Sequence, residues 1–215
     1  MQMSGNYGSI AKAYVDRTQI DESTEEPGTV RIYVLGYDSE KRLIKTPSLT
    51  KQNLKNYLNE FKMITDDVII QDGFFINFGV VFDVVAYPQT DKSELKIKCI
   101  DVIRDFFNID KMQFKQPIQL GELEYELLGI DGLRNINNLY LTQNNPPAGV
   151  SGPGFDPALH NYDNVGSLTG NNPGYGYPYS ISSDALTGNR TILPSTDPAV
   201  FELRNPDENI KGIVR

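Results

Sequence analysis

The feature that most constrains this chain is a long tract rich in Gly, Pro, Asn and Tyr, which runs from Asn144 to about Thr196. Residues 171–180, NNPGYGYPYS, are typical of it. Connections of this length are uncommon in compact domains unless they are functional or disordered. The chain then continues as AVFELRNPDENIKGIVR, in which apolar and charged residues alternate as in a strand. Any fold must therefore hold a strand at the far end of this tract.

Composition excludes several classes of protein. The net charge of -8 opposes attraction to phosphate backbones or anionic lipids, so we expect neither a nucleic-acid nor a membrane partner. The longest apolar run, at 74–87, is interrupted by Asn77 and Asp83 and is shorter than the roughly 20 residues of a membrane span. The first residues lack the apolar core of a signal peptide, which favours a non-secreted protein. The single cysteine, Cys99, permits no intrachain disulfide.

Four regions are predicted along the chain. They are an extended N-terminal segment (1–28), an α+β domain (29–143), an irregular arm (144–198) and a C-terminal strand segment (199–215). The period-two pattern predicts strands in residues 7–20, 29–38, 67–73, 76–88 and 135–143, with a turn at the DSEK sequence, 38–41. In the strand 76–88, Ile76, Phe78, Val80, Phe82, Val84 and Ala86 share the apolar face.

Helical periodicity predicts two main helices. The first is capped by Ser48 or Thr50 and has an apolar stripe through Leu54, Tyr57, Leu58 and Phe61. The second opens at a capping box, Asp91 and Glu94, and has a stripe through Leu95, Cys99, Val102, Ile103 and Phe106. Residues 118–133 are ambiguous, because their leucines suit a short helix while Gly121 and Gly129 weaken it. These elements predict a small mixed sheet with both main helices on one face, a split-βαβ (ferredoxin-like) arrangement.

Groups that could perform catalysis are sparse. His160 is the only histidine and has Asp156 and Asp163 near it in a loop sequence, and Cys99 falls on the buried stripe of a helix. Asp66 and Asp67 suit a turn, whereas Asp101 and Asp105 suit a solvated helix face. No phosphate-binding glycine motif occurs next to a predicted strand. We therefore expect no enzyme, cofactor, metal ion or small-molecule substrate.

The tract itself is the strongest functional candidate. Gly-rich and Pro-rich segments bury too little apolar surface to fold alone, but this one carries five aromatic anchors: Phe155, Tyr162, Tyr175, Tyr177 and Tyr179. The strand AVFEL could add to an exposed sheet edge of its own domain or of another subunit. The alternative interpretation is a disordered linker with a tail that docks on its own domain.

Four segments together resemble a known family. GSIAKAYV (8–15), RIYVLGYDSEKRLI (31–44), FFNIDK with QPI (106–118) and AVFELRNPDENIKGIVR (199–215) look like the C-terminal part of the baseplate wedge protein of T4-like contractile-tailed phages, in the baseplate-J-like family. The order is the same and most of the chain is covered, although none of the motifs is a catalytic signature. The family subunit is larger, so the resemblance implies a fragment or a split version.

The resemblance implies a non-enzymatic structural subunit of the virion tail, assembled in the host cytoplasm. Its partners would be copies of itself, as a dimer or ring, and other wedge proteins, in a baseplate whose rearrangement triggers sheath contraction. The interface would include the stretch from Ile10 through Tyr14 to Val15, the aromatic residues of the tract, and Phe201 and Leu203 in the terminal strand. Two alternatives remain: a small ligand-binding or regulatory domain with the tract as a lid, and an enzyme centred on His160.

Overall fold

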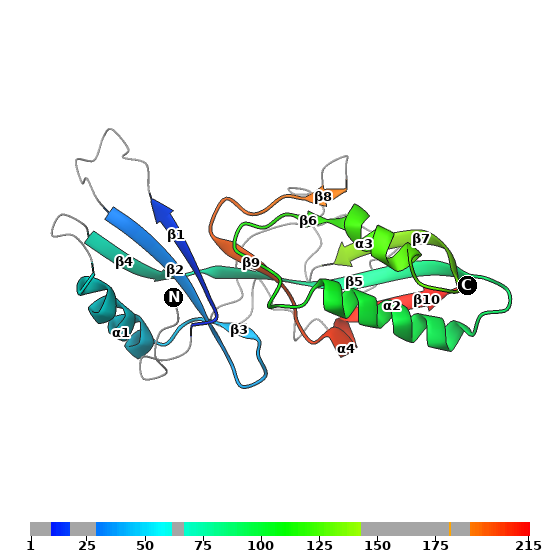
Figure 1. Cartoon of the computed structure of the whole chain (residues 1–215), viewed down its shortest axis with the longest axis horizontal. Coiled ribbons are helices and arrows are strands. Elements are labelled where there is room, and N and C mark those ends of the chain that lie inside the picture. The colour runs from blue at the N-terminus through cyan, green and yellow to red at the C-terminus, as the bar shows by residue number, and fades with distance from the viewer. Residues whose placement is uncertain (1–9, 18–28, 62–66, 143–180, 182–189) are drawn as a thin grey trace, which may run out of the picture. The chain divides into compact units, whose positions relative to one another are not determined.

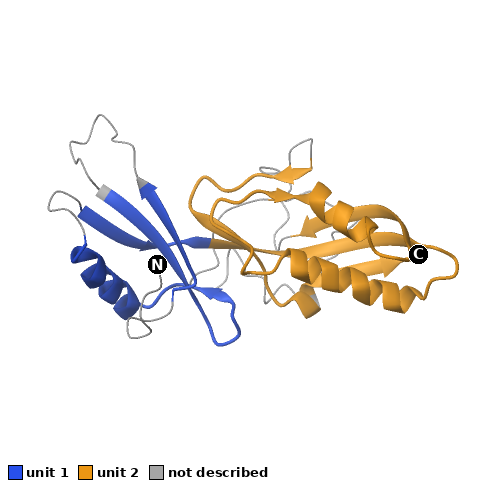
Figure 2. Ribbon diagram, viewed as in Figure 1, with its two compact units in different colours: residues 1–74 blue, residues 75–215 orange. Residues whose placement is uncertain are grey.

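The computed structural model describes residues 10–17, 29–61, 67–142, 181 and 190–215 (Figure 1). The described residues form helices and several sheets, which confirms the predicted α+β class. The chain divides into two compact units, residues 1–74 and residues 75–215 (Figure 2). Each unit contains a sheet of its own.

Unit 1 is built around the central strand β2. Its elements are β1 (Lys12–Arg17), β2 (Thr29–Tyr37), β3 (Leu43–Ile44), α1 (Ser48–Asn59) and β4 (Asp67–Asp72). Strand β2 pairs antiparallel with β1 and β3 and parallel with β4. Parallel neighbours need a crossover connection, and α1 supplies it by packing against β4. Unit 1 therefore contains a βαβ motif with an antiparallel strand added at its edge.

The turn between β2 and β3 is closed by Asp38. Its Oδ1 accepts hydrogen bonds from the amides of Glu40 (2.9 Å) and Arg42 (2.8 Å), and its Oδ2 accepts one from Arg42 Nε (2.7 Å). Burial opposes ionisation of this carboxyl, but the hydrogen bonds and the Arg42 charge outweigh it, so the pKa of Asp38 lies below its ordinary value. Lys41 completes the turn in the left-handed region. The predicted DSEK turn is confirmed.

Helix α1 begins differently from the prediction. Its N-cap is Pro47, with no side-chain capping bond, so the prediction that Ser48 or Thr50 caps the helix is wrong. Proline has a fixed φ that suits the start of a helix, which places Ser48 already within the first turn. The helix ends at Asn59, and Phe61, expected on the apolar stripe, is 63% exposed. An ion pair between Lys51 Nζ and Asp72 Oδ2 (2.8 Å) joins α1 to β4.

Unit 2 contains the longest strand, β5. Its elements are β5 (Phe74–Ala86, which begins at the boundary), α2 (Lys92–Phe106), β6 (Ile118–Gln119), α3 (Leu120–Leu128), β7 (Leu133–Thr142), β8 (Thr191–Ile192), β9 (Ala199–Leu203), α4 (Pro206–Asn209) and β10 (Ile210–Val214). The sheet order is β10-β5-β7, and β9 also pairs with β5. Strand β10 runs parallel to β5, while β7 runs antiparallel to it. The short strands β6 and β8 pair separately.

The core of unit 2 lies between its sheet and two helices. Helices α2 and α3 contact each other and lie on the same side of the sheet, in front of it in Figure 1. The ring of Phe78 meets that of Phe107 at a centroid distance of 4.9 Å. The predicted apolar face of β5 is confirmed, since all six of its residues are buried: Ile76, Phe78, Val80, Phe82, Val84 and Ala86.

The two helices of unit 2 follow their sequence patterns. Asp91 caps α2, with its Oδ1 accepting from the amide of Ser93 (2.8 Å), and the helix buries Leu95, Cys99 and Ile103. The ambiguous stretch 118–133 contains the helix α3, whose buried residues are Leu120, Leu123 and Leu127. Among the described residues, no helix combines the length and the apolar character that crossing a membrane requires.

The predicted single sheet is replaced by separate sheets in two units. Strands β2 and β4 are direct neighbours, so the intervening strand of a split-βαβ motif is missing there. The range 29–143 is divided between the units, because β5 pairs with β7, β9 and β10 instead of with β2 or β4. The predicted arm, 144–198, includes β8, and the predicted single strand segment, 199–215, contains β9, α4 and β10.

Candidate functional site

Titratable side chains do not converge on a site in the described part of the chain. In those ranges, no group of three or more His, Cys, Asp or Glu side chains could hold a metal ion. Asp101 pairs with Arg104 (3.2 Å) and Asp105 with Lys111 (2.8 Å), on the exposed side of α2. Asp67 is exposed at the start of β4. The candidate His160 and its neighbours, and also Asp66, lie outside the described residues.

Cys99 lies in the core of unit 2, as its position on the apolar stripe predicted. Its side chain is fully buried, and this burial raises the pKa of Cys99 to about 11. A thiolate is the reactive form of cysteine, and the raised pKa disfavours it. Cys99 is therefore a structural residue whose ionisation is coupled to the folding of α2.

We expect alkylation of Cys99 to report unfolding of unit 2. At pH 8 the thiolate fraction of the folded protein is about a hundredfold below that of a thiol with the ordinary pKa of 9.0, and burial also blocks access. Iodoacetamide labelling followed by mass spectrometry should be slow in buffer and fast in urea. Labelling that is equally fast in both would contradict the buried position.

The same shift sets a pH dependence of stability. Below pH 9 the thiol is protonated in both states, whereas between pH 9 and 11 the unfolded chain ionises first and unfolding becomes more favourable. The difference in unfolding free energy between the wild type and Cys99→Ala should therefore shrink as pH rises through this window. Urea titrations at pH 8 and pH 10.5 measure it, and a constant difference would be the contrary result.

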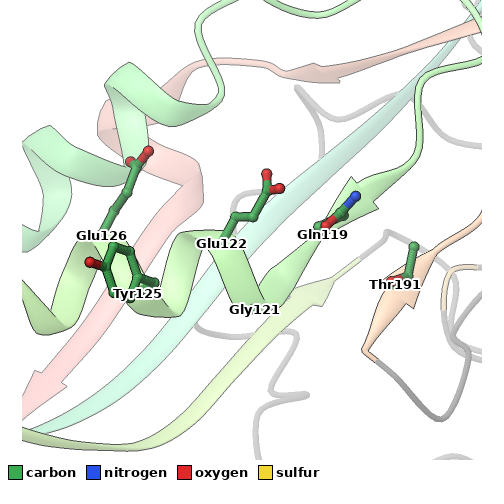
Figure 3. Close-up of a pocket in the computed structure, with 6 residues that line it drawn as sticks. All are labelled: Gln119, Gly121, Glu122, Tyr125, Glu126 and Thr191. Atoms are coloured by element: carbon green, nitrogen blue, oxygen red, sulfur yellow. The ribbon is translucent and has the colours of Figure 1, made fainter.

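One shallow pocket lies at the start of α3, with a volume of about 440 Å³. Figure 3 shows the residues that line it, which belong to α3 and to the paired strands β6 and β8: Gln119, Gly121, Glu122, Tyr125, Glu126 and Thr191. Tyr125 is 82% exposed, and both carboxylates face solvent. The pocket therefore offers a polar, acidic surface without a buried reactive group.

The C-terminal segment forms part of the unit 2 core. Every residue of β9 is buried, and the Phe201 ring packs edge-on against that of Phe78 at a centroid distance of 6.3 Å. Phe201 and Leu203 were predicted as interface residues, and the structure corrects this by placing both in the core of their own chain. The alternation in AVFEL does predict a strand, but it does not specify the sheet that the strand joins.

Strand β10 fits against β5 because residue 212 has no side chain. Gly212 lies opposite Phe82, which is 1% exposed, and a Cβ atom at residue 212 would lie 2.0 Å from Phe82 Cζ. Glycine in a strand often marks a close approach of another group, and here that group is a core aromatic ring. The last strand of the segment is thus fitted to this position on β5.

The sheet of unit 2 has a second face, opposite the helices. We call it the open face and define it by the residues that alternate with the core: Val81, Asp83, Val85, Asn138, Tyr140 and Ile213. Ile213 is 57% exposed and Tyr140 36%, while Val81 and Val85 are half-buried. At its centre Arg215 Nη2 pairs with Asp83 Oδ2 (3.0 Å). The sequence predicted a mixed second face, but it did not indicate which apolar residues remain exposed.

The remaining predicted interface residues fall into two groups. Ile10 and Tyr14 lie in unit 1, where Ile10 precedes β1 and Tyr14 is paired with Tyr33 across β1 and β2; both are half-buried. The aromatic residues of the tract lie outside the described residues: Phe155, Tyr162, Tyr175, Tyr177 and Tyr179. No model of a known protein family matches the chain, and no curated protein matches it.

Proposed function

We propose that the chain is a structural subunit of the baseplate wedge of a contractile phage tail. In this role it joins copies of itself and other wedge proteins into a ring that supports sheath contraction, within a virion assembled in the host cytoplasm. The identity proposed for the chain rests on the four segments that resemble the wedge family. The open face of unit 2 is the observation that supports an assembly role.

The composition of the open face suits contact with another protein. Exposed apolar side chains that gather on one surface mark interaction sites more often than apolar residues scattered singly. Here Ile213 and Tyr140 flank a central ion pair, Asp83 with Arg215, and Tyr140 Oη donates to Asn138 Oδ1 (2.8 Å). Protein interfaces combine an apolar core with polar groups in this way. A partner that covers this face would bury Ile213 and keep the ion pair satisfied.

The C-terminal segment gives the tract a different role from the one predicted. The described chain of unit 2 stops at the end of β7 and returns at Arg190, just before β8, after which β9 and β10 join β5. Arg190 Nη2 donates to the carbonyl oxygen of Leu139 (3.0 Å), which ties this return point to β7. We therefore propose that the aromatic residues of the tract contact neighbours while the described segments on both sides of the tract stay in unit 2.

The test is sedimentation velocity over a wide concentration range, on the wild type, Ile213→Lys and Ile97→Lys. We expect the wild type to self-associate and Ile213→Lys to weaken that association at least tenfold, because a charge replaces an apolar contact. Ile97 is the matched control, since it is 60% exposed in the same unit but lies on helix α2. Circular dichroism establishes that all three proteins are folded.

Two results would count against the proposal. If the wild type stays monomeric at every concentration, the proposal that the chain joins copies of itself is wrong. If both substitutions weaken association equally, the open face is not the contact. A second candidate function, a small ligand-binding or regulatory domain, is favoured by the pocket at α3. A thermal shift with a cationic metabolite such as spermidine, lost in Glu122→Gln, would support that candidate instead.

A further inference from the structure

We infer that strand β1 of unit 1 pairs antiparallel with β1 of a second copy, so that two sheets become continuous. This inference rests on the proposed self-assembly and adds to it a second contact, on unit 1, besides the open face of unit 2. Among the described strands β1 pairs with β2 alone, and this pairing is unbroken from Lys12 opposite Leu35 to Arg17 opposite Val30. Its other edge thus presents a regular ladder of backbone groups, which is a template for another strand.

The edge strand β7 of unit 2 differs from β1. Its register with β5 shifts at two places, between Asp83 and Val84 and between Val85 and Ala86. Such irregularities twist an edge away from pairing. In addition, Arg190 Nη2 donates a hydrogen bond to the carbonyl oxygen of Leu139 on this strand. The chain thus blunts this edge of unit 2, whereas β1 has a regular register.

The sequence of β1, KAYVDR, is complementary to itself in one register. When Tyr14 lies on the twofold axis, Lys12 of each copy lies opposite Asp16 of the other, and Ala13 lies opposite Val15. Opposite charges across an antiparallel pair stabilise it. A shift by one residue places Lys12 opposite Arg17 and interchanges the two faces of the sheet, and centring on Val15 removes both ion pairs. The chemistry of the strand therefore selects the Tyr14 register and a second copy as the partner.

The residues of β1 differ in exposure from one to the next. Val15 is 56% exposed, and Ala13 beside it is also exposed, so their pairing would cover an apolar surface. Lys12 is 7% exposed, and both Lys12 and Tyr14 already have contacts within their own chain. Pairing would add to these contacts. Because solvent screens a largely covered charge less, the carboxylate of Asp16 in the second copy would act on Lys12 more strongly than in a fully exposed pair.

The test uses two charge variants of the full chain, Asp16→Lys and Lys12→Asp. Each alone places like charges opposite each other in the homodimer, so each should self-associate at least tenfold more weakly than the wild type. An equal mixture restores both pairs, because every position 12 then faces an opposite charge at position 16. Sedimentation velocity of the mixture should therefore give a heterodimer with an affinity close to that of the wild type, with circular dichroism as the check on folding.

The outcomes separate this inference from the proposed function. Rescue in the mixture supports pairing through β1 in the Tyr14 register. If the wild type associates and both folded variants associate equally well, the β1 contact is overturned while the proposed assembly role stands. If both variants associate more weakly and the mixture associates no better than either variant alone, the register is overturned. If the wild type never associates, both the inference and the self-assembly proposal fall. Tyr14→Phe, which keeps the ring, is the matched control and should associate like the wild type.

Discussion

Replacing Gly212 by alanine is expected to destabilise unit 2 by about 3 kcal/mol, because the new Cβ atom would overlap a buried ring. It would lie 2.0 Å from Phe82 Cζ and 2.3 Å from Cε2. Phe82 cannot move aside easily, since it is almost fully buried. Urea denaturation, followed by alkylation of Cys99 as the probe of unit 2, measures the loss.

Gly121→Ala is the matched control for this substitution. A Cβ atom at residue 121 meets no heavy atom within 4 Å, and the residue lies within helix α3. Alanine forms helices better than glycine, so the control should stabilise the protein by about 0.5–1 kcal/mol. Opposite signs for the same chemical change would establish that the effect at Gly212 comes from its contact with Phe82. Equal effects would mean that β10 does not pack on β5 as described.

Removing residues 199–215 is expected to abolish cooperative folding of unit 2. From sequence alone, this deletion should leave the domain folded and weaken only its association. In the structure it removes β9 and β10 from β5 and strips the core of Val200, Phe201, Leu203 and Ile210. Each such side chain contributes about 1.5–3 kcal/mol when buried. Their sum is comparable with the total stability of a typical domain, about 5–15 kcal/mol.

The deletion is assessed by near-ultraviolet circular dichroism and by Cys99 alkylation in buffer. We expect weak tertiary signals and rapid labelling. A synthetic peptide of residues 199–215 is the control, because supplying the missing strands in trans should slow the labelling again. If Cys99 is labelled as slowly in the truncated protein as in the full chain, unit 2 folds without residues 199–215. The C-terminal segment would then be an arm, as the sequence predicted.

Local patterns in the sequence predicted the elements well. The apolar alternation in β5 and the stripe on α2 depend on neighbours in the same element, so the positions of Phe78 and Ile103 followed from periodicity alone. The start of α1 was misplaced because its serine and threonine suggested a cap, although Pro47 already marked the boundary. The two-residue strands β3, β6 and β8 are too short to produce a pattern.

Strand partners could not be predicted from the same signals. Periodicity shows that Phe201 and Leu203 share a face, but it contains no information on which strand lies beside them. Their burial on β5 depends on pairing across the long tract, and so does the join of β10 to β5. Gly212 was the available signal, since a glycine in a strand indicates a close approach, but its partner Phe82 is distant in sequence. The open face likewise depends on which side of the sheet the helices cover.

The pairing of β5 with β10 also has a consequence for biosynthesis. Asp83 and Arg215, joined by a hydrogen bond of 3.1 Å, are 132 residues apart in the sequence. The described strands of unit 1 pair with one another, so this unit can form while the ribosome is still translating unit 2. The ribosome must translate more than half of the chain after β5 before β10, its last neighbour in the sheet, emerges. During that interval its apolar edge is open to wrong partners, and contacts of such long range form slowly. Synthesis of the final strand is therefore the step that commits unit 2 to its native sheet.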